Sequence, residues 1–291
     1  MVVALPKKTY VFFDERYPYS WIPHNVGKII AEKLSGYDFE VIDANGLKKI
    51  VEEGSRTTTA EYVIVFAQDI VPDTVLDNPT NPSIYSPLRK FLNVGHTIVW
   101  IGDVPLYYVG TPGNKLDTPK AMQTVLNLNP EFKNTNRMVG LTATGIIFGL
   151  TEWIGRRPHN NTPPITGTVH YVPLARMTNN SQYLHAFIIH YKQSMPLSGF
   201  IRIYDCPINH IEMITDSFIR SLVGAALRSI HNVLWRKMSL LNKKIQKLSE
   251  NIDTLYNTLK SEIDSLKSAL EDIIKMEKEI LNTMQKKPIE C

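Results

Sequence analysis

Short apolar runs alternate with segments of helical periodicity over the first hundred residues. Runs rich in β-branched and aromatic residues predict buried strands at 9–13, 39–42, 62–66 and 96–101. Between them, apolar residues recur every three or four positions until a glycine, which predicts helices over 23–36, 47–54 and 88–95. Because strand and helix alternate with short connections, we expect an α/β fold with a mostly parallel sheet and helices on both faces.

The pattern fades after Gly110 and returns near residue 168. We expect mainly loops over 110–167, apart from a helix near 120–128. Further strands are expected at 168–172, 184–190 and 199–204. A single helix over 211–235 is expected to face the sheet with Ile214, Phe218, Leu222, Ala225 and Ile230.

The C-terminal tail has a heptad pattern. With Met238 at position a, every later a position is apolar: Ile245, Ile252, Leu259, Leu266, Ile273 and Ile280. The d positions begin as Leu241, Leu248 and Leu255 and then lose their apolar character, while Ile263, Leu270 and Met284 make position e apolar. A helix over 238–284 is about 70 Å long. Its alternative, folding back onto its own head, needs a groove of that length, so the pattern favours a coiled coil.

This organisation predicts a head at 1–235 and a tail at 236–291, with self-association through 238–284. The composition also bears on two classes of partner, nucleic acids and membranes. A net charge of +4 over 291 residues is mild, and the basic residues of 236–247 fall on the solvent face and the flank of the heptad, so a nucleic-acid partner is not indicated. No apolar run is long enough to cross a membrane.

Cysteine usage and the N-terminus point to a compartment. Cys206 and Cys291, the two cysteines, form neither a disulfide framework nor a zinc pattern. At the N-terminus the lysines follow a short apolar stretch, the reverse of a secretion signal. We therefore expect a cytoplasmic protein. No metal motif occurs, and we expect no cofactor.

Several segments together carry a resemblance to a known fold. They are Ile30–Leu34, Tyr37–Val41, Tyr62–Phe66, Leu88–Trp100 and the late stretch Gly199–His210. In this order they resemble the class I glutamine-amidotransferase-like superfamily, which has a flavodoxin-like sheet, and within it the trehalose-utilisation branch. The resemblance covers roughly 9–110 and 184–231 and implies a ligand site at the carboxyl ends of the strands.

The chain departs from that family at its catalytic position. Amidotransferases place a cysteine in the turn after the fourth strand, where this chain has Gly102, Asp103 and Val104. The histidine that the trehalose-utilisation branch carries in that turn is also missing. The branch's final Gly-His turn is Asn209-His210 here. We therefore expect no glutaminase activity.

Polar residues that follow the strands are the candidate site. Asp103 follows the 96–101 strand, where it is either a general base or ligand, or a turn residue that caps backbone amides. His210 is the other catalytic candidate. The loop after the first strand shares this edge of the sheet, so a ligand pocket is expected to be lined by Asp103 with Asp14, Glu15, Arg16, Tyr17 and Trp21.

Other constellations have ordinary structural interpretations. Cys206 and His210 could be a nucleophile and its base, but a small buried thiol at a strand end is common. His185 and His190 lie five apart in one strand and face opposite sides if it is regular. Arg156, Arg157 and His159, near Trp153, could bind an anion or form a solvated loop.

Two functions compete on these grounds. The first is a non-catalytic binding or scaffold protein whose coiled coil assembles the particle, and which could take a protein partner or a small ligand. The second is a hydrolase or other enzyme acting on a carbohydrate or small acid through Asp103, His210 and the 14–16 loop. The missing nucleophile favours the first.

Overall fold

The structure is a computed structural model that describes residues 7–161, 170–192, 197–228 and 230–285. It divides into two compact units, Met1–Lys237 and Met238–Cys291. The first unit is built around one large mixed sheet, in the strand order β2-β1-β3-β5-β13-β12-β11-β8-β9, with β10 paired to β12.

Five strands form the parallel half of this sheet. They are β1 (Lys7–Phe12), β2 (Glu40–Ile42), β3 (Glu61–Phe66), β5 (Thr97–Trp100) and β13 (Gly199–Arg202). The helices between them are α1 (His24–Ser35), α2 (Ala44–Gly54) and α3 (Pro87–Val94). These elements confirm the predicted alternation of strand and helix.

The other half of the sheet is antiparallel. Its strands are β8 (Arg137–Leu141), β9 (Ile154–Gly155), β10 (His159–Asn160), β11 (His170–Met177) and β12 (Asn180–His190). The sheet as a whole is therefore mixed rather than mostly parallel. Thr168 and Val169, in the strand expected at 168–172, lie outside the described residues.

The 110–167 segment has more structure than the sequence predicts. Besides β8, β9 and β10 it contains β7 (Asn114–Asp117), α4 (Lys120–Leu126) and α5 (Ala143–Ile147). β6 (Tyr108–Thr111) joins β7 and the short β4 (Val71–Pro72) in a separate three-stranded sheet, and a 3-10 turn, η1 (Asp73–Val75), follows β4. These strands have two to five residues each, too short for a clear apolar alternation.

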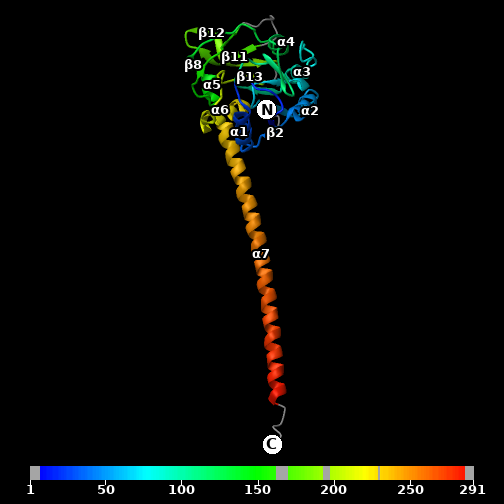
Figure 1. The fold of residues 1–291 in the computed structure, drawn as a ribbon. Helices are drawn as coiled ribbons and strands as arrows, with labels where there is room; N and C mark the ends of the chain where they lie inside the picture. The colour runs from blue at the N-terminus through cyan, green and yellow to red at the C-terminus, as the bar shows by residue number, and fades with distance from the viewer. Residues whose placement is uncertain (1–6, 162–169, 193–196, 229, 286–291) are drawn as a thin grey trace. The chain divides into compact units, whose positions relative to one another are not determined.

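Helices cover both faces of the large sheet, as expected (Figure 1). On one face, Ile30 of α1 and Leu222 of α6 (Asp216–Leu227) pack against Val63 and Val99. On the other face, residues of α2, α3 and α4 pack against the opposite side chains of the same strands, such as Trp100. Each face thus has its own apolar core.

The helix expected over 211–235 is interrupted. A 3-10 turn, η2 (Ile211–Met213), precedes α6, whose N-cap Thr215 accepts a hydrogen bond from the Phe218 amide. α6 ends where Arg228 takes a left-handed conformation, with φ of 60°. Ile214, Phe218, Leu222 and Ala225 are buried as predicted. The side chain of Ile230 lies outside the described ones.

The described part of the tail belongs to one continuous helix, α7 (Ile230–Gln285), without a break (Figure 1). The large apolar residues at its a and d positions from Met238 to Ile280 are between 55% and 69% exposed. No described helix has the length and apolar character needed to span a membrane.

Candidate functional site

The loops after β1, β3 and β5 meet at the carboxyl ends of these strands. The chain leaves β1 toward β2 on one side and later enters β3 on the other, so a topological switch point lies between β1 and β3. Asp69, which follows β3, joins the loops: its carboxylate accepts the Ser20, Trp21 and Asp103 amides at 3.1, 2.7 and 3.2 Å. Burial raises the pKa of Asp69.

Gly102 permits this close approach. Its φ of +83° favours glycine, and a Cβ there would lie 2.9 Å from Oδ2 of Asp69. The sharp turn after β5 expected from the sequence is therefore present, and it brings the backbone of Asp103 onto Asp69.

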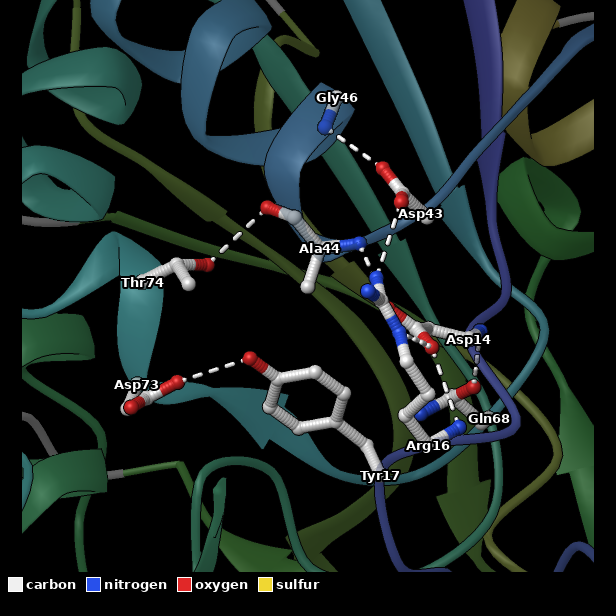
Figure 2. Close-up of polar contacts among 9 residues, drawn as sticks. All are labelled: Asp14, Arg16, Tyr17, Asp43, Ala44, Gly46, Gln68, Asp73 and Thr74. Carbon is white, nitrogen blue, oxygen red and sulfur yellow. Dashed lines mark hydrogen bonds and ion pairs between the residues drawn. The ribbon is translucent and has the colours of Figure 1, made fainter. Parts of the chain in front are cut away.

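Asp14 forms a charged cluster beside the switch point (Figure 2). Its buried carboxylate accepts Nε and Nη2 of Arg16 at 2.8 and 2.6 Å and the Ala44 amide, at the start of α2, at 3.0 Å. Arg16 also reaches Asp43, the N-cap of α2, at 2.9 Å. Burial alone would raise the pKa of Asp14, but these hydrogen bonds outweigh it and lower the pKa.

The side chains of Tyr17 and Glu15, the other residues predicted in this loop, do not bond to the Asp14–Arg16 cluster among the described residues. Tyr17 donates its hydroxyl to Asp73 at 3.0 Å, and Figure 2 shows its ring pointing away from the contacts of Asp14 with Arg16. Glu15 is exposed, and its carboxylate has no hydrogen bond or ion pair among the described residues. Gln68 accepts the Asp14 amide at 2.8 Å, while its own buried Nε2 has no partner in the described part of the chain.

Asp103 is buried and already bonded. Its carboxylate accepts the Ser20 hydroxyl, the Arg157 guanidinium and the Val104 amide, each at 2.7 Å. The Val104 contact is the turn-capping role expected of an aspartate in such a loop. The Arg157 contact is an ion pair that sequence reasoning had not connected to Asp103.

Arg157 joins the predicted loop to the antiparallel half of the sheet. Its guanidinium lies over the ring of Trp21, 4.6 Å from the centroid, and 5.6 Å from that of Phe132. Its backbone amide donates to Asp205 at 2.9 Å. Arg157 therefore belongs to a packed network rather than to a solvated loop.

Asp205 is the centre of a second buried cluster. It accepts Nε1 of Trp153 at 2.8 Å and Nδ1 of His185 at 2.7 Å, in addition to the Arg157 amide. His185 and Asp205 are both completely buried. Gly155 makes room for this pair, because a Cβ there would overlap Nδ1 of His185.

Arg202, in β13, is a completely buried cation whose guanidinium has a single hydrogen bond in the described structure. Its Nη1 donates to the carbonyl of Arg157 at 2.7 Å, whereas Nε and Nη2 have no partner among the described residues. Burial lowers the pKa of Arg202 to about 10. Buried Nε2 atoms of His159 and His185 also lack partners within the described ranges. Unpartnered atoms thus gather around β10, β12 and β13.

The two histidines of β12 do not meet. His185 contacts Asp205, while His190 accepts the amide of Leu197 at 3.3 Å. Within the described ranges, no group of three His, Cys, Asp or Glu side chains could hold a metal ion.

His210 does not join Asp103. Its side chain is exposed, whereas Asp103 is buried, and no hydrogen bond or ion pair of the described residues connects them.

Cys206 is buried and lines a cavity of about 240 Å³ with the rings of Trp153, Tyr204 and Phe218. No hydrogen bond of the described chain links Cys206 to His210, so the structure does not show a nucleophile–base pair.

We expect Cys206 to resist alkylation. Burial raises the pKa of its thiol to about 12 from an ordinary value of 9.0. Since the thiolate is the reactive form, native Cys206 should react with iodoacetamide at pH 8 about 1000-fold more slowly than in urea-unfolded protein. Peptide mass spectrometry checks this rate. Fast native labelling would contradict the burial of Cys206, and Cys291 serves as the internal comparison.

The sequence had signals for part of this site. Asp69 and Asp205 each follow an apolar run, as Asp103 does, so the rule that selected Asp103 could have selected them. The pairing of Asp205 with His185 has no such signal, because it depends on how β12 and β13 pair.

Comparison with known proteins places the chain in a family. Residues 7–229 match the MJECL34 family. The chain is 53% identical over 283 residues to the MJECL34 protein of Methanocaldococcus jannaschii, with 97% of this chain and 95% of that protein covered. It is also similar to the crystal structure of a ThuA-like protein from Bacteroides uniformis, with a TM-score of 0.39, 12% identity and coverage of 79% and 93% of the two chains. The chain belongs to the MJECL34 family.

Proposed function

We propose that the chain is a non-catalytic scaffold or binding protein, with an amidotransferase-like head, that self-associates through a coiled coil formed by α7. The observation that carries this proposal is the row of exposed apolar residues along α7, from Met238 to Ile280. Hiding such a row from water is strongly favourable, and a helix with this heptad pattern can do so by pairing with another copy.

The contacts of the head support a non-catalytic role. The turn after β5 holds Asp103 in place of a cysteine, and that carboxylate already has three donors. The remaining thiol of the head, Cys206, is buried and has a raised pKa. His210 is exposed and has no carboxylate partner among the described residues. None of these groups is arranged as a nucleophile with its base.

An enzyme acting on a carbohydrate or small acid is a second candidate. The observation that favours it is the buried His185–Asp205 pair, whose histidine keeps an Nε2 without a partner in the described structure, as does His159. A general base needs such an arrangement. Because His185 is completely buried, a substrate reaches it only if the surrounding loops move, and the scaffold is therefore better supported.

The test of self-association is a pair of matched variants. Leu248→Lys with Leu255→Lys places two charges in the d positions, which should convert the oligomer to a monomer because charged residues in the seam cannot be buried unpaired. Thr254→Lys with Asn257→Lys adds the same charge on the outer face and should keep the oligomer. Light scattering of the full chain measures both. Oligomers of equal mass for the two variants would place the interface outside the seam, and a monomeric mass for the outer-face variant would reject self-association.

A further inference from the structure

We infer that α7 pairs with α7 of a second copy in the antiparallel direction, about a twofold axis that crosses the helices between Tyr256 and Thr258. This inference rests on the proposed self-association and adds the direction and register of the two helices. It follows from three properties of α7: the charges beside the seam, the residues within the seam and the exposure of its large apolar side chains.

The charges beside the seam change sign along the helix. The g positions are, in order, Lys237, Lys244, Asn251, Thr258, Ser265, Asp272 and Glu279. In an antiparallel pair g faces g, and centring on Thr258 sets Lys237 against Glu279 and Lys244 against Asp272. The twofold axis repeats each pair, so four attractive contacts form.

The parallel arrangement offers no such attraction. There, g faces e of the following heptad, so both lysines face uncharged residues, Asn242 and Ser249. Farther along, Asp272 faces Glu277, and the symmetry repeats this repulsion. The whole helix shows the same bias: 238–258 contains three lysines and two acidic residues, whereas 259–279 contains four lysines and six acidic residues. Antiparallel helices therefore place the half with more lysines than acidic residues against the half with more acidic residues than lysines.

The seam is also consistent with the antiparallel register. This register forms the layers Met238–Met276, Leu241–Ile273, Ile245–Ala269, Leu248–Leu266, Ile252–Glu262 and Leu255–Leu259, each occurring twice. Every layer except Ile252–Glu262 is apolar on both sides. All the large apolar members are more than half exposed in the single chain, so they are available to a partner.

Glu262 discriminates between the two directions. It occupies a d position, and in a parallel, in-register pair it would face Glu262 of the second copy, which places like charges in the seam. In the antiparallel register it faces Ile252, against whose side chain its methylene groups can pack while the carboxylate reaches water. A single carboxylate per layer is less costly than two.

Cysteine crosslinking tests the direction. In the full chain with Cys291→Ser, the variants Leu248→Cys and Leu266→Cys are prepared singly and together, with Glu250→Cys as an outer-face control. Antiparallel pairing separates the two copies of position 248 by 18 positions along the helix axis, about 27 Å, which is far beyond disulfide reach. Mild oxidation should therefore crosslink neither single variant, whereas the double variant and a mixture of the two singles should crosslink.

The alternative outcomes are distinct. Efficient crosslinking of Leu248→Cys alone would overturn the antiparallel inference while leaving self-association intact. Light scattering of the reduced proteins gives the second readout. A monomeric mass for the Cys291→Ser parent would reject the proposed self-association itself, and a trimer would reject the twofold pair. No crosslink in the double variant of a proven dimer would also reject the register.

Discussion

A chain that ends at Lys237 is expected to be a folded monomer, whereas the full chain is expected to be an oligomer. The unit Met1–Lys237 contains both apolar cores of the large sheet, so its stability does not depend on residues beyond 237. The part removed carries the exposed seam of α7. Multi-angle light scattering measures the mass, and circular dichroism measures the fold of the truncated chain.

The expected effect is large because the seam has many members. Burying one Leu or Ile side chain fully is worth about 1.5–3 kcal/mol, and association costs roughly 4–15 kcal/mol in lost freedom. The apolar a and d positions of two helices together exceed that cost even if each is only partly buried. Their removal should therefore eliminate association rather than weaken it.

The control for this truncation is a chain that keeps α7 but carries the two lysines at positions 248 and 255. Both proteins should have the mass of one chain, although only one lacks the helix. If the truncated head keeps the oligomeric state of the full chain, the interface lies on the head, and α7 has another role.

The parallel half of the sheet could be predicted because its signals are local. The run at 62–66 is continuous and apolar and the run at 96–101 is rich in β-branched and aromatic residues, as expected of strands buried on both faces, and a glycine marks the end of the helix before each of them. The same locality located Asp14 and Asp103, since each directly follows a strand of this half. Their shared edge follows from parallel topology alone.

The antiparallel half could not be predicted in the same way. β8, β9 and β10 are short, and their order is fixed by pairing with the distant β11 and β12. β11 and β12 also pair irregularly, with register shifts between Pro173 and Met177. The periodicity of two that would reveal a face is interrupted there. The left-handed Arg228 that ends α6 has no sequence signal, because arginine is an ordinary helix residue.

The contacts between the parallel and antiparallel halves of the sheet could not be predicted either, because they join residues that are far apart in the sequence. Arg157 bonds Asp103, 54 positions earlier, and His185 bonds Asp205 across the β12–β13 pair. Each residue alone has an ordinary interpretation as a solvated arginine or a buried histidine. Only the fold shows that Arg157 and His185 bond to the carboxylates at the strand ends. Asp103 is therefore part of a hydrogen-bonded network rather than a base that is available to a substrate.

Asp205→Ala is expected to destabilise the head more than any other substitution at the site. The change leaves three donors without an acceptor: the buried Nε1 of Trp153, the buried Nδ1 of His185 and the part-buried Arg157 amide. An unsatisfied buried donor costs about 1–3 kcal/mol, so the two buried donors alone cost roughly 2–6 kcal/mol. The loss also removes a negative charge near the buried Arg202. A total of this size approaches the whole stability of an ordinary domain.

Urea unfolding followed by tryptophan fluorescence measures the change, because Trp21, Trp100 and Trp153 all lie in the first unit. Asp103→Ala is the matched control. It also removes a carboxylate with three donors, but Arg157 is 27% exposed at its side chain and can turn to water, so a smaller loss of about 1–3 kcal/mol is expected. Asp205→Asn should fall between them, because its amide keeps one acceptor oxygen.

The order of these losses separates a structural role from a catalytic one. A catalytic residue often lowers the stability of the folded protein. Replacing such a residue therefore often leaves the free energy of unfolding unchanged or raises it. If Asp205→Ala unfolds at the same urea concentration as the unsubstituted chain, the His185–Asp205 pair is not needed for the fold. The enzyme candidate would then gain the support that the scaffold loses. A large loss, in the expected order, instead assigns the pair to the architecture that joins the two halves of the sheet.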